Sequence, residues 1–82
     1  MAAFQGTVAS FDAVQAAGFI TPANGSTYPS DNDTVEVLDD DIYFNALQLR
    51  SDDVIPPTPG QNVTFDLQVD LDGLEAVNIT ST

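Results

Sequence analysis

The fold is decided by the stretch NVTFDLQVDLDGLEAVNIT, residues 62–80. Every second residue from Val63 to Val69 is apolar and the residues between them are polar, a period of two that is typical of a strand with one buried face. A turn signal, Leu71-Asp72-Gly73, follows, and a second apolar run covers residues 74–80. The stretch therefore predicts two strands joined by a tight turn.

Similar short runs recur outward from this hairpin. They are rich in Val, Ile, Thr, Phe and Tyr, they lie between clusters of Gly, Pro, Asn and Asp, and helical periodicity is nearly absent. This pattern is typical of a small all-β barrel or sandwich. The expected additional strands cover residues 4–11, 17–21, 34–38 and 42–47, with a tight connection at residues 12–16.

Two segments are expected to lie outside the strands. Residues 22–30, PANGSTYPS, contain two prolines and an Asn-Gly pair, which predicts a loop or turn. Residues 54–60, VIPPTPG, contain three prolines, which cannot donate to a ladder of hydrogen bonds, so we expect an exposed crossing loop. Between them, Val35 and Val37 alternate with other residues, and we expect residues 34–38 to add an extra strand beside the main sheet.

The charge of the chain is extreme. Thirteen acidic residues and a single basic residue, Arg50, give 82 residues a formal net charge of -12. Self-repulsion of this kind destabilises the compact state at low salt. The absence of lysine suits a protein that works in concentrated salt, where the screening length falls to about 3 Å at molar ionic strength. A solvated acidic surface without special meaning, or an engineered composition, gives the same pattern, and the sequence leaves these readings open.

Length and composition favour one small domain, residues 1–82, held together by packing. The chain has no cysteine for a disulfide and no histidine or cysteine for a structural zinc site. It carries no pattern of a signal peptide and no apolar run of membrane-spanning length. We expect a soluble, cytoplasmic monomer that uses no cofactor and contacts no membrane, and, without histidine, cysteine or lysine, no enzyme.

Five short segments follow one another in a family-specific order. They are Gly6-Thr7-Val8, Phe11-Asp12-Ala13, Gly18-Phe19-Ile20-Thr21-Pro22, Gly60-Gln61-Asn62-Val63-Thr64-Phe65 and Ala76-Val77-Asn78-Ile79-Thr80. In this order they resemble the cold-shock domains, of which the chain would be a divergent, strongly acidic member. The resemblance spans nearly the whole chain and implies a five-stranded barrel of the oligonucleotide-binding (OB) type, with a possible inserted β-hairpin between its second and third strands.

The two ribonucleoprotein motifs of that family are only partly retained. The first, roughly Lys-Gly-Phe-Gly-Phe-Ile, corresponds to Gln15-Ala16-Ala17-Gly18-Phe19-Ile20, and the second, roughly Val-Phe-Val-His-Phe, to Asp40-Asp41-Ile42-Tyr43-Phe44. After the second motif, Asn45-Ala46-Leu47 is similar to the family's Ser-Ala-Ile. The departures are Ser10 for a Trp, Ala17 and Asp41 for Phe, and Ala9 and Gln15 for lysines.

The resemblance implies binding of single-stranded RNA or DNA by base stacking on aromatic rings, which is worth about 1–3 kcal/mol per base. The residues that it assigns to this face are Phe11, Phe19, Tyr43 and Phe44. Because the lysines are missing, the counterion-release contribution is nearly absent, and the expected binding is weak and salt-dependent. The same rings would otherwise be ordinary core or half-buried strand aromatics, an alternative that the sequence leaves open.

The acidic segment of residues 23–40 is far longer than the turn that joins the corresponding strands in the family. As an insert it could cover the binding sheet, mimic a phosphate strand or extend an edge. The chain could accordingly be an acidic barrel that binds a basic protein or mimics nucleic acid, or an engineered fold with a reduced alphabet and no selected ligand. Oxygen ligands for Ca²⁺ could come from the cluster Asp31-Asn32-Asp33 and the run Asp39-Asp40-Asp41, but their spacing predicts diffuse cation binding and no specific metal site.

Overall fold

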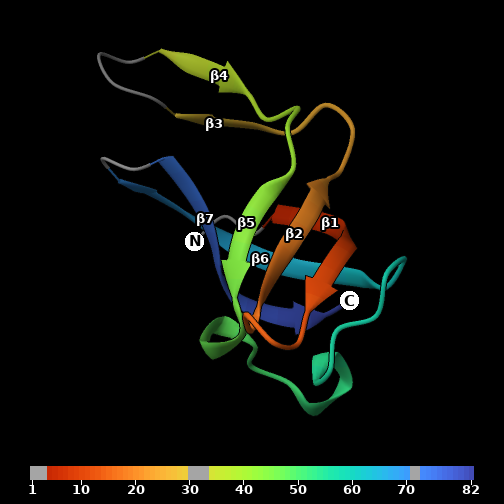
Figure 1. Cartoon of the computed structure of the whole chain (residues 1–82). Helices are drawn as coiled ribbons and strands as arrows, with labels where there is room; N and C mark the ends of the chain where they lie inside the picture. Colours follow the sequence, from red (N-terminus) through yellow and green to blue (C-terminus); the bar gives the residue numbers. More distant parts are fainter. Residues whose placement is uncertain (1–3, 30–33, 71–72) are drawn as a thin grey trace.

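The computed structural model of the chain describes residues 4–29, 34–70 and 73–82. Five strands close into a barrel in the spatial order β1-β2-β5-β7-β6, with β6 pairing back onto β1 (Figure 1). Four of the five pairs are antiparallel and one, between β5 and β7, is parallel. The strands are β1 (Phe4–Asp12), β2 (Ala17–Pro22), β5 (Ile42–Asn45), β6 (Asn62–Asp70) and β7 (Gly73–Ser81). The prediction of an all-β, five-stranded barrel of the OB type is confirmed.

A two-stranded ribbon, made of β3 (Thr27–Pro29) and β4 (Val35–Val37), stands apart from the barrel between β2 and β5 (Figure 1). The expected extra strand and inserted hairpin are therefore present. The prediction that residues 22–30 are entirely loop or turn is wrong, because Pro22 ends β2 and residues 27–29 form β3. The prolines are tolerated because they lie at a strand end and in a ribbon in which each strand has one neighbour among the described residues.

Both ends of the barrel depend on local irregularities in the strands. In β1 an extra residue, Ala9, interrupts the register with β2 between the pairs Val8–Ile20 and Ser10–Phe19. Such a bulge bends a strand and increases its twist, and β1 pairs with β6 over residues 4–7 and with β2 over residues 6–12. In the pair β6–β7, Asn78 has a positive φ of 52° at the irregularity in register, and its side-chain amide donates to Asp66 Oδ2 at 3.1 Å.

Gly18 explains how closely β1 and β2 approach. A Cβ atom on this residue would lie 2.2 Å from the carbonyl oxygen of Ser10 and 2.9 Å from the Cα of Phe11. Any side chain at this position would therefore force the two strands apart.

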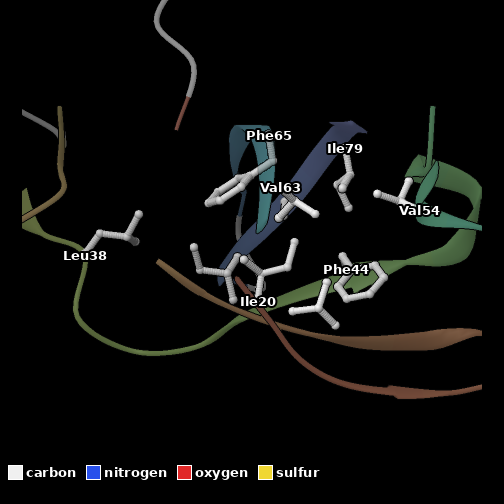
Figure 2. Packing of buried hydrophobic residues seen from close by; sticks show 10 residues of the cluster. Ile20, Leu38, Phe44, Val54, Val63, Phe65 and Ile79 are labelled. Atoms are coloured by element: carbon white, nitrogen blue, oxygen red, sulfur yellow. The ribbon is translucent and has the colours of Figure 1, made fainter. Parts of the chain in front are cut away.

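The barrel encloses ten buried apolar residues (Figure 2). Most come from inward-facing positions of the strands, and two come from other segments: Leu38 follows β4, and Val54 ends the short 3₁₀ helix η3 (Asp52–Val54). Among the described residues, the set is Val8, Ile20, Leu38, Ile42, Phe44, Val54, Val63, Phe65, Ala76 and Ile79.

The proline-rich segment of residues 54–60 contains no strand, as predicted, but it is not fully exposed. Val54 is 0 % exposed and Pro57 is also buried. Gln61 fastens the segment, since its side-chain amide donates to the carbonyl of Asp53 at 2.6 Å and its own carbonyl oxygen accepts from the backbone N–H of Thr58 at 3.2 Å. The segment therefore closes one end of the core rather than merely crossing it.

Candidate nucleic-acid interface

The centre of the candidate site is a cross-strand aromatic pair on the outer face of the barrel. Phe19 of β2 lies opposite Tyr43 of β5, and the two side chains are 45 % and 41 % exposed. Their ring centroids are 6.2 Å apart with an angle of 74° between the ring planes. Such an edge-to-face arrangement stabilises an aromatic pair, and it leaves part of each ring in contact with solvent.

The alternation of the strands explains why these two rings point outward. Gly18 lies opposite Phe44 and Ile20 lies opposite Ile42, and all four residues are buried. Phe19 and Tyr43 occupy the positions between them, so a period of two places both rings on the other face. The apolar residues on the inner face of β2 and β5 thus fix the orientation of the exposed pair.

Phe44 does not belong to the exposed face, which corrects its assignment to the stacking platform. Its side chain is 0 % exposed, and its ring stacks on that of Phe11 with centroids 6.0 Å apart and an angle of 13° between the planes. A ring without exposed surface offers no face to a base. Phe11 is half-buried and, through its pairing with Gly18, shares a face with Phe44. Of the predicted group of four, Phe19 and Tyr43 therefore lie on the outer face, and Phe11 borders the cavity beside them.

A cavity of about 340 Å³ adjoins the three aromatic rings. Residues from β1, from the turn at residues 13–16 and from β2 and β5 surround it. Ser10 and Ala17, where the cold-shock resemblance would place Trp and Phe, are among these residues, and their small side chains leave the space open. The lining is Ser10, Phe11, Asp12, Gln15, Ala17, Gly18, Phe19 and Tyr43.

Asp12 supplies the negative charge of this cavity, and it was not assigned to the site from the sequence. Its Oδ1 accepts hydrogen bonds from the backbone N–H of Val14 at 2.9 Å and of Gln15 at 3.3 Å. The carboxylate therefore orders the turn between β1 and β2 and brings Gln15 to the rim. An Asp at the start of a short connection is a usual sequence signal of such a turn. The cavity beside it could not be predicted in this way, because it depends on the pairing of β1 with β2.

The electrostatic character of the outer face is set by a row of five residues in register. Ser10 pairs with Phe19, Phe19 with Tyr43, Tyr43 with Glu75, and Glu75 with Gln68. Partners in a sheet lie on the same face, so this row crosses all five strands. It contains one carboxylate and no cation.

Asp41 adds a second negative charge at the edge of this face. It directly precedes β5, and its Oδ1 accepts a hydrogen bond from the hydroxyl of Thr21 at 2.9 Å. Thr21 is an exposed residue two positions after Phe19, so it lies on the same side of β2. The aromatic pair therefore has one carboxylate, Asp41, next to it along the chain and another, Glu75, next to it on the neighbouring strand β7. At low ionic strength these charges repel phosphate groups.

The comparisons with known proteins do not identify a family: no protein-family model matches the chain, and no curated protein matches it significantly. The fold and the aromatic pair therefore carry the argument for function. None of the helices in residues 4–29, 34–70 and 73–82 is long and apolar enough to cross a membrane.

Arg50, the single basic residue of the sequence, is held away from the aromatic pair. It follows the 3₁₀ helix η2 (Ala46–Gln48), and its guanidinium donates to the carbonyl oxygen of Leu47 at 2.5 Å and to Gln48 Oε1 at 3.4 Å. Its backbone N–H donates to the carbonyl oxygen of Ile79 at 2.7 Å. Arg50 thus joins η2 to β7 and brings no positive charge to the row on the outer face.

Possible metal ligands do not gather in the described part of the chain, where no group of three or more Asp or Glu side chains is arranged to hold an ion. Of the acidic residues considered for Ca²⁺, Asp31 and Asp33 lie outside the described residues, whereas Asp39, Asp40 and Asp41 are exposed and follow β4. Of these three, Asp41 accepts the hydrogen bond from the Thr21 hydroxyl.

Proposed function

We propose that this protein binds single-stranded RNA or DNA on the outer face of β2 and β5, as a cold-shock-like module with a reduced platform that works best in concentrated salt. The observation that carries the proposal is the exposed pair Phe19 and Tyr43, which lies on an OB-type barrel beside a cavity lined by Phe11. Exposed aromatic rings on such a sheet bind bases of any sequence because every base has a π-face.

The size of the platform limits the affinity. With Phe44 in the core, two rings are available on the surface and a third is reached only at the cavity. At about 1–3 kcal/mol per stacked base, two or three stacks correspond to dissociation constants in the micromolar to millimolar range after the cost of ordering the strand. We therefore propose a weak, sequence-tolerant interaction.

Salt determines whether this interaction is observable. Asp12, Asp41 and Glu75 surround the rings, and the whole chain carries a net charge of -12. At about 0.1 M salt the screening length is about 10 Å, so carboxylates beside the rings still repel the phosphates of a bound strand. At molar salt the screening length of about 3 Å removes most of this repulsion, while stacking persists.

The proposal is tested by NMR titration of the protein with oligo-dT and with oligo-U in molar KCl. The expected result is a progressive shift of the Phe19 and Tyr43 resonances, which is lost in Phe19→Ala and in Tyr43→Ala. Leu47→Ala is a matched control, because Leu47 is exposed but lies on η2, and it should leave the shifts unchanged. No perturbation of either ring at millimolar protein, at any salt concentration, would rule out the proposed function.

A further inference from the structure

The ribbon of β3 and β4 has two different faces. Its register pairs Thr27 with Val37, Tyr28 with Glu36, and Pro29 with Val35. Tyr28 packs against the barrel core, so the face that it shares with Glu36 is directed toward the protein. The opposite face, composed of Thr27, Pro29, Val35 and Val37, is named the valine face here, and its two valines are 64 % and 62 % exposed.

The ribbon is fixed to the barrel at its base, which makes the valine face a defined surface. Leu38, directly after β4, is only 4 % exposed and belongs to the core. Its backbone N–H donates to the carbonyl oxygen of Ser26 at 2.8 Å, which continues the pairing of the two strands one step beyond the ribbon. The valines are therefore exposed on a ribbon that is attached to the barrel, and their exposure does not result from detachment of the ribbon.

The ribbon also presents a strand edge. Among the described residues, β3 and β4 pair only with each other, so each has an outer edge without a neighbouring strand. Because the N–H of Leu38 donates to Ser26, the alternation of an antiparallel pair turns the N–H of Glu36 toward β3 and those of Val35 and Val37 toward the outer edge of β4. On β3, Pro29 lacks a backbone N–H. The outer edge of β4 is thus the better template for the addition of another strand.

Charge indicates which strand would fit. Glu36 lies within β4 and Asp39 and Asp40 follow it closely, all exposed and without a nearby basic residue in the sequence from Thr34 to Leu49. A second copy of this chain would bring another net charge of -12 to the same place, which opposes pairing between copies. An incoming strand with lysine or arginine at alternate positions would instead meet opposite charge.

We propose that the outer edge of β4 and the valine face bind an extended, cationic segment of a partner protein, in which apolar β-branched residues alternate with lysine or arginine. The partner strand adds to β4 through backbone hydrogen bonds. Its apolar side chains cover Val35 and Val37, and its cationic side chains lie near Glu36, Asp39 and Asp40. This interaction does not depend on the aromatic pair of β2 and β5 and is therefore separate from the proposed nucleic-acid binding.

The test uses three synthetic peptides of equal length: alternating Lys-Val, alternating Lys-Thr and alternating Glu-Val. Binding to the full chain is measured by fluorescence anisotropy of labelled peptide at about 0.1 M salt, where charge attraction still acts over about 10 Å. The Lys-Val peptide is expected to bind most tightly, and amide exchange of Val35 and Val37 is expected to slow in its presence because their N–H groups at the outer edge become paired.

Val35→Thr combined with Val37→Thr separates the apolar contact from the charge, since threonine keeps the branched shape and the net charge. The double variant is expected to bind the Lys-Val peptide about tenfold more weakly and the Lys-Thr peptide unchanged. Val14→Thr is the matched control, because Val14 is 95 % exposed in the turn between β1 and β2.

Several outcomes would overturn the inference. Equal binding of the Lys-Val and Lys-Thr peptides would show diffuse charge attraction alone, and so would unchanged binding by the double variant. Concentration-dependent dimerisation that the double variant abolishes would assign the valine face to a second copy of the chain. Binding of oligo-dT that is lost in the double variant but kept in Tyr43→Ala would assign the ribbon to nucleic acid.

Discussion

The division of the β2 and β5 aromatic residues into a buried and an exposed set predicts very different costs for two neighbouring substitutions. Phe44 is 0 % exposed and stacks on Phe11, whereas Phe19 is 45 % exposed. Removal of a buried Phe ring typically lowers the free energy of unfolding by about 3–5 kcal/mol. Loss of a stacked aromatic pair accounts for roughly 0.5–1.5 kcal/mol of such a change. Phe19→Ala removes a ring that is half in water and should cost about 1 kcal/mol or less.

The assay is urea denaturation followed by far-UV circular dichroism at one fixed, high KCl concentration, because the chain has no Trp to report by fluorescence. A domain of this length has a total stability of roughly 4–12 kcal/mol, so Phe44→Ala can remove most of it. Phe44→Leu keeps part of the volume and should cost about 1–2 kcal/mol, which remains measurable. Equal costs for Phe19→Ala and Phe44→Ala, or a stable Phe44→Ala protein, would refute the assignment of the two faces.

Three further perturbations follow from the same structure. Gly18→Ala should destabilise the barrel by about 1–3 kcal/mol in the same denaturation assay, because its Cβ would lie 2.2 Å from the carbonyl oxygen of Ser10; an unchanged midpoint would contradict the close approach. Leu38→Ala should lower the free energy of unfolding by about 2–5 kcal/mol and shift the backbone NMR resonances of β3 and β4, since it removes the anchor of the ribbon. Unchanged ribbon resonances would contradict that role. Asp39→Asn combined with Asp40→Asn should raise the melting temperature at about 0.1 M KCl and leave it nearly unchanged at molar KCl, whereas an increase of the same size at both salt concentrations would exclude charge repulsion as the cause.

The strands could be predicted from the sequence because their signal is local. Alternation of apolar and polar residues located β6, and short runs rich in Val, Ile, Thr, Phe and Tyr located β1, β2, β5 and β7, to within one or two residues of their observed ends. The ribbon was predicted in part, since residues 34–38 alternate. An inserted hairpin was expected, but its first strand, β3, was not located, because the two prolines and the Asn-Gly pair of residues 22–30 favoured a loop over three residues whose pairing partner, among the described residues, is β4.

Only those features of the site that follow from the alternation of side chains along a strand could be predicted from the sequence. Ile42 and Phe44 share a face of β5 with Tyr43 between them, so the sequence does contain the signal that Phe44 points inward with Ile42. The family resemblance alone placed Phe44 with the stacking residues. The cavity, the row across five strands and the burial of Val54 depend on contacts between residues far apart in the chain, and no local pattern specifies them.

The central claim, that bases stack on an acidic OB-type barrel at high salt, has a distinctive thermodynamic signature. Proteins that bind nucleic acid through lysine and arginine release counterions, so their affinity falls steeply as salt increases. Here the only charges near Phe19 and Tyr43 in the described residues are carboxylates, and salt removes a repulsion. The dependence of affinity on salt should therefore have the opposite sign.

The most direct test is the dissociation constant for oligo-dT, measured by NMR titration or fluorescence anisotropy across a KCl series from about 0.1 M to molar concentrations. The protein must remain folded throughout, which circular dichroism verifies at each salt concentration. The account predicts that binding strengthens with KCl, reaches a plateau and is lost in Tyr43→Ala. Binding that is strongest at low salt and weakens as KCl increases, or binding that Tyr43→Ala leaves intact, would contradict it.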